Sequence, residues 1–319
     1  MKSLLLPAIA LSFALSSTVS ASAESAFIGN WALTLPNERA GWLGVEKTDG
    51  ELSSSLLWGG GSVLPTASTT LEGGTLTVIK ETTNKEGKVS RQTITATVDG
   101  DQMNLAASRG NGKPETFTGK RIPPVPAAPD LSSVQYGEPI PLLNGKDLSG
   151  WRLVDEHADN GWSVVDGILQ NRVDKTSGKH YGNLRTDAEF EDFNLTTEVR
   201  TPEGSNSGIY LRGVYEIQIM ESHGQPVDSH HMGALYSRIT PSVAAEKPVN
   251  EWQTLDITLV DRHITVILNG TTIIDNQPAH GCTGGALTSD EFKPGPILLQ
   301  GDHTNVDYRN MVLHPVVAK

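Results

Sequence analysis

The sequence predicts an all-β protein in which a small antiparallel, barrel-like region precedes a larger two-sheet sandwich. Short runs of alternating apolar and polar residues, the pattern of half-buried strands, recur along most of the chain. Glycine accounts for 32 of the 319 residues, and turn pairs such as DG, GG and NG separate the runs. Long segments with helical periodicity are scarce. A chain of this length can form two domains that each bury a core.

Residues 1–23 have the order of a secretory signal peptide. Lys2 precedes an apolar run over residues 4–15, and the small residues Ala-Ser-Ala end the segment. We therefore expect cleavage after Ala23 and export to the periplasm or the medium. The apolar run is too short to span a membrane, and no other stretch approaches the roughly 18 apolar residues that a spanning helix needs. We expect no membrane insertion.

Residues 24–121 read as an antiparallel meander. Runs such as GTLTVIKETT and RQTITATVDG alternate in polarity and are separated by turn sequences such as NKEG. The opening Gly29-Asn30-Trp31 resembles the G-x-W start of lipocalin-type barrels, in which the tryptophan plugs one end. We therefore expect a small calycin-like barrel. It could bind a ligand or serve as an accessory domain without one.

A proline-rich linker is expected over residues 122–135. Its sequence IPPVPAAPDLSS contains four prolines, which are excluded from sheet interiors and favour an extended spacer. Residues 136–319 then return to short alternating runs, which favour a two-sheet sandwich. Within this region, Asn269-Gly270 lies between two apolar runs and is the strongest hairpin signal in the chain.

Short motifs of the second region follow one another in a specific order. They read LLNGKDLSGW, GWSVVDGIL, NSGIYLRG, YEIQIMES, GALYS, EWQTLDITL, LNGTTIID and GPILLQGDH. This order resembles the 3-keto-disaccharide hydrolase domain family over residues 140–315. The resemblance implies a concanavalin-like jelly roll that cleaves 3-keto-glycosides. The N-terminal region is not covered by it.

The run YEIQIMESH carries the most informative polar pattern. Strand alternation places Glu216 and Gln218 on one face, and Tyr210 and Arg212 share a face of the preceding run NSGIYLRG. If the two runs are neighbouring strands, these four side chains line one sheet face, as in a sugar-binding groove. The alternative is an ordinary solvent-exposed face. Glu221 lies five residues beyond Glu216, so a β-bulge would be needed to return it to the same face.

The frame Glu-x-Gln-x-x-Glu differs from that of jelly-roll glycosidases such as laminarinases, which have Glu-x-Asp-x-x-Glu. The neutral Gln218 cannot tune neighbouring carboxylates as the aspartate does, which argues against an ordinary double-displacement glycosidase. The substrate that the resemblance implies offers another route, because a ketone at C3 makes the C2 proton acidic. Elimination of the glycosidic oxygen and addition of water would follow, and no covalent glycosyl-enzyme is needed.

This route requires a base, an acid and donors for the C3 enolate. Glu216 is the first candidate for the base, and Arg212 or Gln218 for the enolate donor. Glu221 or His303 is the candidate acid. A separate oxidoreductase would have to install the ketone, because the sequence has no dinucleotide-binding fingerprint.

Several further residues are candidates for sugar contacts. Tyr210 shares the polar face described above, and Tyr236 could stack on a pyranose or fill a core. Asn206 could bind a hydroxyl or simply shape a turn. Arg309, on the last run, could be structural. Asp302 could orient the neighbouring His303.

No cofactor is predicted, but a divalent metal remains the alternative because three histidines lie close in sequence. These are His223, His230 and His231. Adjacent histidines on a strand point to opposite faces, so His230 and His231 cannot form the one-face pair of a helical zinc site.

The formal net charge of −12 limits the classes of partner. A chain this acidic is a poor match for nucleic acid or an anionic membrane surface, and it suits a small sugar or glycoside better. A non-catalytic, lectin-like carbohydrate-binding protein is the rival interpretation. Such a protein would be expected to expose tryptophan platforms, whereas Trp151, Trp162 and Trp252 occupy core-like motif positions.

Overall fold

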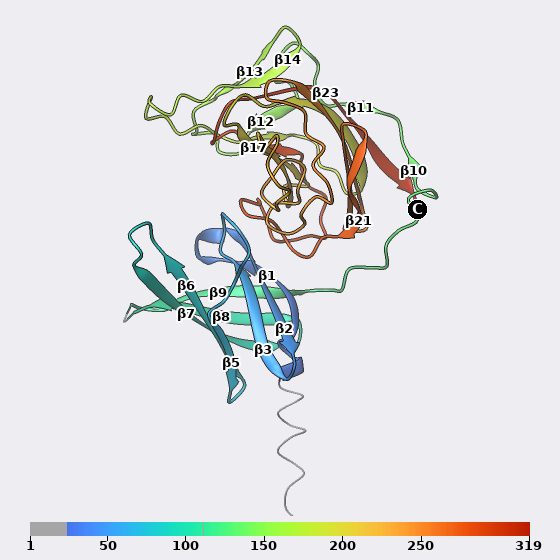
Figure 1. Cartoon of the computed structure of the whole chain (residues 1–319). Helices are drawn as coiled ribbons and strands as arrows, with labels where there is room; N and C mark the ends of the chain where they lie inside the picture. Colours follow the sequence, from blue (N-terminus) through green and yellow to red (C-terminus); the bar gives the residue numbers. More distant parts are fainter. Residues whose placement is uncertain (1–23, 111) are drawn as a thin grey trace, which may run out of the picture.

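The structure is a computed structural model that describes residues 24–110 and 112–319. The expected signal peptide, residues 1–23, lies outside the described residues. Strands dominate the described part, and the sheets are antiparallel, so the all-β prediction is confirmed (Figure 1). No helix among the described residues is long and apolar enough to cross a membrane.

The N-terminal region is one sheet of nine strands, in the order β4-β3-β2-β1-β9-β8-β7-β6-β5. The alternating runs bury one face around Trp31, whose indole N–H donates to the carbonyl of Phe27 at 2.9 Å. The Arg121 guanidinium covers this ring at 4.2 Å from its centroid. The strands are β1 (Gly29–Thr34), β2 (Ala40–Thr48), β3 (Glu51–Leu57), β4 (Leu64–Pro65), β5 (Ser68–Glu72), β6 (Thr75–Thr83), β7 (Val89–Asp99), β8 (Gln102–Arg109) and β9 (Glu115–Ile122); a short 3-10 helix, η1 (Pro36–Glu38), follows β1.

This sheet is not closed into a barrel, so the calycin-like prediction is not confirmed. Its edge strands are β4 and β5, and no pairing joins them in the described part of the chain. β4 is only two residues long and ends at Pro65, which has no N–H to donate to a further strand. A side-chain contact joins β3 to β5 instead, since the hydroxyls of Ser54 and Thr69 lie 2.7 Å apart.

The C-terminal region is a jelly-roll-like pair of antiparallel sheets. The larger sheet has the order β13-β14-β23-β16-β19-β20-β21, with β10 and β11 also on β23, and the smaller has the order β12-β15-β22-β17-β18. The apolar faces of both sheets contribute to one buried core. The strands are β10 (Gln135–Tyr136), β11 (Ile140–Pro141), β12 (Trp151–Leu153), β13 (Trp162–Val165), β14 (Ile168–Asn171), β15 (Leu184–Thr186), β16 (Phe193–Arg200), β17 (Asn206–Leu211), β18 (Tyr215–Met220), β19 (Trp252–Val260), β20 (His263–Leu268), β21 (Thr271–Pro278), β22 (Leu298–Leu299) and β23 (Val306–Ala318).

The predicted hairpin at Asn269-Gly270 is confirmed. The two residues connect β20 to β21 and have φ angles of 52° and 82°. Positive φ at both central positions is the type I′ geometry that matches the twist of the flanking strands.

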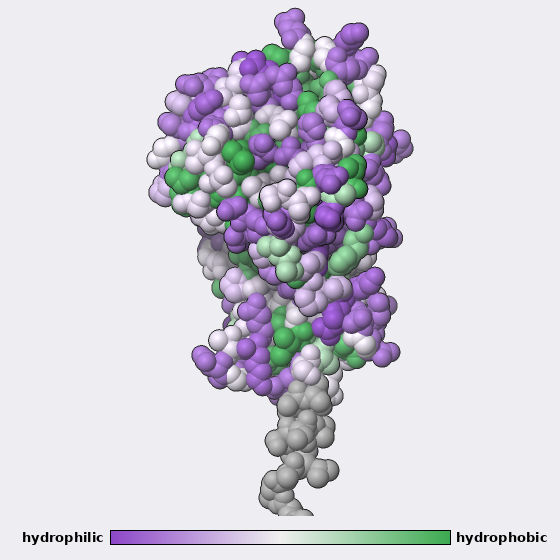
Figure 2. Space-filling model, turned by 90° about the vertical axis from the view of Figure 1, so that its right-hand side faces the viewer, coloured by the Kyte–Doolittle hydropathy of each residue, from purple (hydrophilic) through white to green (hydrophobic). Residues whose placement is uncertain are grey.

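The N-terminal sheet packs against one end of the jelly roll. Trp42 is buried within the hydrophobic core of the C-terminal region, and the Arg238 guanidinium lies 4.5 Å from its ring centroid. Ser62 hydrogen-bonds His230 at 2.8 Å, and the Val63 N–H donates to the Ser237 hydroxyl at 2.9 Å. On the face drawn in Figure 2, hydrophilic residues cover both regions and hydrophobic residues form small patches among them.

Residues between β9 and β10 run along the C-terminal region without forming a strand. The Arg262 guanidinium donates to the carbonyls of Pro123 and Pro124, and the Asn276 amide donates to the carbonyl of Pro129. The proline-rich segment is therefore tied to the jelly roll by its own carbonyls.

Candidate active site

A cavity of about 280 Å³, here called the central cavity, lies where the smaller jelly-roll sheet meets the N-terminal sheet. Polar and titratable side chains dominate its lining. It takes three residues from the N-terminal sheet and eleven from the jelly roll: Arg39, Gly60 and Gly61; and Asn183, Asn206, Tyr210, Glu216, Gln218, Tyr236, Gly284, Gly285, Gln300, Asp302 and His303.

Glu216 and Tyr210 form a buried pair on this cavity. They lie directly opposite each other on β18 and β17, and each is at most 3% exposed. The Tyr210 hydroxyl lies 2.9 Å from Glu216 Oε2 and 2.8 Å from the carbonyl oxygen of Gly284. One hydroxyl hydrogen cannot serve both acceptors fully. A protonated Glu216 resolves this conflict, because it can donate to Tyr210 while Tyr210 donates to Gly284.

The electrostatics favour this protonated form at neutral pH. Burial is the largest effect and raises the pKa of Glu216 to about 8. The hydrogen bond from Tyr210 lowers this pKa, and the negative charge of Asp302 raises it. Loss of hydration disfavours the charged form of a carboxyl group, which explains the direction of the dominant effect. Glu216 can therefore exchange a proton near physiological pH.

Two glycines, which have no side chain, make room for the side chains of Glu216 and Tyr210. A Cβ added to Gly208 would lie 2.3 Å from Glu216 Oε1, and Gly208 sits on β17 opposite Gln218. A Cβ on Gly285, which has φ +81°, would lie 2.6 Å from the Tyr210 hydroxyl. Any larger side chain at either position would displace a member of the pair.

His303 and Asp302 form a second titratable pair on the same cavity, in the loop between β22 and β23. Asp302 Oδ1 lies 2.5 Å from His303 Nδ1, and this hydrogen bond raises the pKa of His303 above its ordinary value. Both side chains remain 46% exposed, so this pair meets solvent while Glu216 does not. The cavity thus has one buried and one accessible proton carrier.

Neutral hydrogen-bonding groups complete the lining. The Gln218 amide N–H donates to the carbonyl of His230 at 3.1 Å, while its Oε1 has no donor among the described residues. Gln300 Oε1 is likewise without a partner there. Tyr236 packs edge-to-face on His230 with ring centroids 5.0 Å apart. Together with Asn206, these groups can bind the hydroxyls or ketone of a sugar.

Arg212 does not reach the cavity, contrary to the expected face. β17 ends at Leu211, and Arg212 has a φ of 55°, so the turn begins there and alternation stops. Its guanidinium donates to the carbonyl of Glu291 at 2.5 Å and lies over Tyr215. The candidate enolate donor from the sequence is therefore buried elsewhere.

Glu221 is also absent from the cavity lining. The register between β17 and β18 runs without interruption to Met220, so the bulge that would be needed to re-aim Glu221 is not formed. The Glu221 N–H donates to the carbonyl of Ser205 beyond the strand end, and its side-chain charge adds to burial in raising the pKa of Glu246. Of the two glutamates in the Glu-x-Gln-x-x-Glu run, Glu216 therefore lines the central cavity and Glu221 does not.

Arg309 belongs to the opposite sheet. It forms an ion pair with Glu198 at 3.0 Å and lies 4.1 Å from the ring centroid of Trp252. These contacts fit the structural alternative for Arg309 and leave it outside the cavity lining.

The three clustered histidines do not converge. Their ring nitrogens contact the carbonyl of Glu246 (His223), the carboxylate of Asp228 (His230) and the carbonyl of Pro226 (His231). Across residues 24–110 and 112–319, no group of three or more His, Cys, Asp or Glu side chains is placed to hold a metal ion.

The contribution of Arg39 was not predicted from the sequence. Arg39 and the glycine run after Trp58 reach the cavity because the two domains touch at backbone level. The Gly285 N–H donates to the carbonyl of Gly59 at 3.1 Å, and a Cβ on Gly284 would lie 2.0 Å from Gly61 O. The three consecutive glycines were the one available signal of such a close approach.

A family model described as the 3-keto-alpha-glucoside-1,2-lyase-like domain matches residues 138–314, which is more than half of the chain. The chain belongs to this family. The resemblance noted in the sequence is therefore confirmed for the C-terminal region, and the Glu216–Tyr210 and Asp302–His303 pairs lie inside the matched residues. Arg39 and the glycine run lie outside the matched family domain. A sugar substrate is implied by the family.

Solved structures similar to this chain are also carbohydrate-related in description. A proposed glycosyl hydrolase from Parabacteroides distasonis is 28% identical, with 61% of this chain and 93% of that chain covered and a TM-score of 0.46. Another from the same organism is 24% identical, with 56% and 98% covered and a TM-score of 0.42. A carbohydrate-binding module from Bacillus subtilis is 14% identical, with 51% and 93% covered and a TM-score of 0.34. No curated protein matches the chain.

Proposed function

We propose that this protein cleaves 3-keto-glycosides by removal of the C2 proton, elimination and hydration. The observation that carries the proposal is the convergence of two titratable pairs, Glu216–Tyr210 and Asp302–His303, on one cavity of a domain from the 3-keto-glucoside lyase-like family. A separate oxidoreductase would supply the ketone.

The reaction is balanced without a change of oxidation state in the protein. A base takes the C2 proton, and the electrons of the C2–H bond form an enolate whose charge rests on the C3 oxygen. Collapse of the enolate breaks the bond from C1 to the glycosidic oxygen, which takes a proton from an acid as it leaves. Water then adds across the C1=C2 bond of the resulting enone, with its hydroxyl at C1 and its proton at C2.

Glu216 is the group best suited to remove the C2 proton. With a pKa of about 8, roughly a tenth of it is ionised at pH 7, and that ionised fraction is a stronger base than an ordinary carboxylate. Tyr210 stabilises the ionised form by donating its hydroxyl hydrogen at 2.9 Å.

His303 is the proposed acid for the leaving oxygen. Asp302 holds its imidazolium form by raising its pKa, and exposure to solvent lets it be reprotonated after each turnover. Gln218 replaces Arg212 as the proposed donor to the C3 enolate, since its amide has a second N–H and lies on the same strand as Glu216.

The rival function is carbohydrate binding without turnover, and the neutral amides of the lining favour it. Against it, simple binding has no need of a buried carboxyl group whose pKa is about 8. The tryptophans of the jelly roll also offer no open platform, because Trp151 and Trp162 are at most 7% exposed. Trp252 has the guanidiniums of Arg309 and Arg200 over its ring.

The test is release of a chromogenic leaving group from a 3-keto-glucoside. Wild-type protein should cleave it and leave the unoxidised glucoside intact, because only the ketone acidifies the C2 proton. Glu216→Gln keeps the shape but removes the proton acceptor, so turnover should fall by roughly 10² to 10⁴. Arg91→Ala, in an exposed ion pair with Glu81, is the matched control and should retain activity.

Binding of the 3-keto-glucoside without release of its leaving group would support the carbohydrate-binding alternative. Full activity in Glu216→Gln would instead move the role of base to His303.

A further inference from the structure

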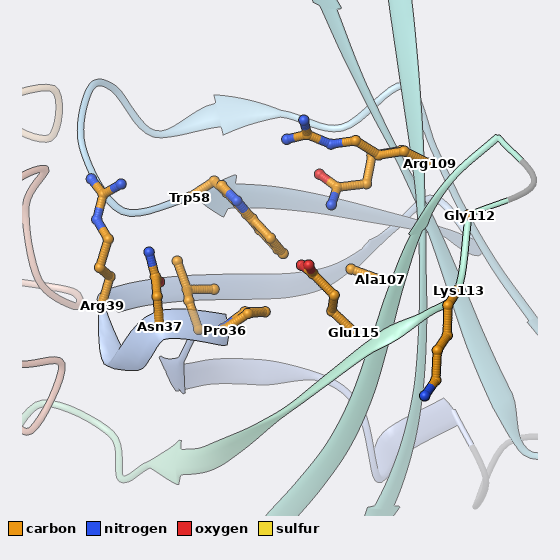
Figure 3. A pocket seen from close by; sticks show the side chains of 11 residues that line it. Pro36, Asn37, Arg39, Trp58, Ala107, Arg109, Gly112, Lys113 and Glu115 are labelled. Atoms are coloured by element: carbon orange, nitrogen blue, oxygen red, sulfur yellow. The ribbon is translucent and has the colours of Figure 1, made fainter.

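A second cavity, of about 440 Å³, opens on the N-terminal sheet and is here called the sheet cavity. Figure 3 shows the side chains of Trp58, Arg109 and Glu115 around it, with Arg39 at one end. Gln92 and Lys113 also line it. None of these residues belongs to the matched family domain, so the family assigns them no role.

The sheet cavity and the central cavity are neighbours. Arg39 lines both of them. Trp58 lines the sheet cavity, and the chain then continues directly into Gly60 and Gly61, which line the central cavity. A molecule that extends from Glu216 toward the N-terminal sheet therefore meets Arg39 first and Trp58 next.

The polar groups of the sheet cavity are not used within the protein. Over the part of the chain that the structure describes, no hydrogen bond or ion pair is formed by the side chains of Arg39, Arg109, Glu115 or Gln92. Gln92 is only 7% exposed. Leaving the buried Gln92 without a partner costs free energy, whereas the exposed Arg39, Arg109 and Glu115 are free to bind a ligand with oxygen atoms.

The charge of this lining is opposite to that of the whole protein. Arg39, Arg109 and Lys113 outnumber the single carboxylate of Glu115, whereas the chain carries a formal net charge of −12. A local cationic site in an acidic protein attracts anionic groups, and guanidinium groups bind carboxylates through paired hydrogen bonds. Trp58 packs edge-to-face on Phe117, and the Lys80 ammonium lies 5.1 Å from its ring centroid; the part of the indole that lines the cavity adds an apolar surface suited to the C–H face of a sugar ring.

We propose that the sheet cavity binds the leaving group of the substrate, a sugar ring that carries a carboxylate. This inference rests on the proposed function, because it assigns the 3-keto ring to the central cavity. Binding energy from this remote ring would then be available to hold the scissile bond between Glu216 and His303. The N-terminal sheet would thereby set the specificity of an enzyme whose proton transfers occur on the jelly roll.

The first test measures binding of two probes, D-glucuronate and D-glucose, to the full chain by isothermal titration calorimetry. Glucuronate should bind at least about tenfold more tightly than glucose, and added salt should weaken it. Arg109→Ala and Trp58→Ala should each weaken glucuronate binding by about tenfold. Arg91→Ala removes a guanidinium of the same sheet outside the cavity and should have no effect.

Two variants keep the test informative if Trp58→Ala fails to fold. Trp58→Phe retains an aromatic ring, and Arg109→Gln retains a donor without the charge; thermal melting of each identifies any loss of folding. Equal affinity for glucuronate and glucose, or unchanged glucuronate binding in a folded Arg109→Gln protein, would overturn the proposal.

The second test compares cleavage of a 3-keto-glucosyl glucuronide with cleavage of methyl 3-keto-glucoside. The ratio of their kcat/KM values should favour the glucuronide and fall about tenfold in Arg109→Gln. Cleavage of both without preference would refute the sheet-cavity proposal and leave the proposed function standing. Glucuronate binding at Trp58 without any cleavage would refute the proposed function and leave the binding site standing.

Discussion

At the scale of single residues, Glu216 gains its chemistry from two opposing neighbours. Burial among apolar strands raises its pKa to about 8, whereas the Tyr210 hydroxyl lowers it by donating to the ionised form. The balance between these effects places the proton of Glu216 within reach of neutral pH. Tyr210 is therefore a positioning residue whose removal should be visible in the pH dependence of the reaction.

The pH profile of kcat/KM is expected to be bell-shaped. A base must be deprotonated to act, so activity should grow as pH rises through the pKa of Glu216. The acid His303 must be protonated, so the profile should fall at higher pH as the imidazolium is lost. Tyr210→Phe removes the interaction that lowers the pKa of Glu216, and the rising limb should move to higher pH.

This shift is measured by comparing the pH profiles of wild type and Tyr210→Phe on one 3-keto-glucoside. A purely structural role of Tyr210 would lower the rate at every pH and leave the rising limb in place. Tyr236→Phe serves as the matched control, because the Tyr236 ring lines the same cavity and packs on His230, while its contact with Glu216 is a backbone hydrogen bond that phenylalanine keeps.

Residue-level prediction from the sequence succeeded where alternation continued and failed where a strand ended. Glu216 and Gln218 reach the cavity because both lie within β18. Arg212 and Glu221 lie just beyond the strand ends, where the backbone no longer alternates. The alternation of residues along a strand predicts which sheet face a side chain lies on only where the strand is paired. The residue at which a strand ends is poorly predicted from the sequence alone.

At the scale of elements, the paired strands β17 and β18 are the frame of the site. Gly208 on β17 lies beside Glu216, and the missing side chain is what admits the carboxyl group. This glycine has no unusual φ, so its role is space rather than backbone conformation. The sequence NSGIYLRG indicated a strand but gave no reason to single out its glycine.

Gly208→Ala is therefore expected to reduce turnover by at least about 10²-fold, since a Cβ 2.3 Å from Glu216 Oε1 must displace the carboxyl group. Gly270→Ala is the matched control. Its φ of 82° makes alanine strained by about 1 kcal/mol, but nothing lies within 4 Å of the added Cβ and the hairpin is remote from the cavity lining.

Thermal melting should show that both variants are folded, while the 3-keto-glucoside assay should show a loss only in Gly208→Ala. Equal activity of the two variants would mean that Glu216 has room to move and that the frame is less rigid than its packing indicates.

Local turns could be predicted from the sequence, but the pairing of strands at the sheet edges could not. The hairpin at Asn269-Gly270 could be predicted because two residues determine its turn. Closure of the N-terminal sheet could not, because it depends on whether two distant edge strands meet in space. The two-residue β4 and the proline at its end leave the sheet open.

At the scale of the whole molecule, the two domains share a core, and this could not be predicted from either domain alone. Trp42 lies on the N-terminal sheet but packs into the core of the C-terminal region, beneath Arg238. The sole cysteine, Cys282, is buried at the same contact, and burial raises the pKa of its thiol to about 12. It is therefore a packing group in this structure rather than a reactive thiol.

This shared core fixes the position of Arg39 and the glycine run over the central cavity. Apolar residues at an interface between domains alternate along a strand in the same way as residues of a domain core. The alternation of the sequence therefore does not show whether such a residue packs within its own domain or against the other domain. The sequence indicated a proline-rich spacer between two regions, whereas the contacts of Trp42 join them directly.

Trp42→Ala is expected to separate the unfolding of the two domains. The substitution removes a side chain that is 7% exposed, which typically costs about 3–5 kcal/mol. Trp42 lies outside the separate core of the N-terminal sheet around Trp31, so that sheet should still fold. Calorimetry should show one transition for wild type and two for Trp42→Ala, and the affinity for a 3-keto-glucoside should fall because Arg39 is no longer held over the cavity.

Leu64→Ala, at a 52% exposed position of the same sheet, should change neither measurement. A single transition together with an unchanged KM in Trp42→Ala would show that the two domains are coupled by the hydrogen bonds of Ser62 and Val63 instead.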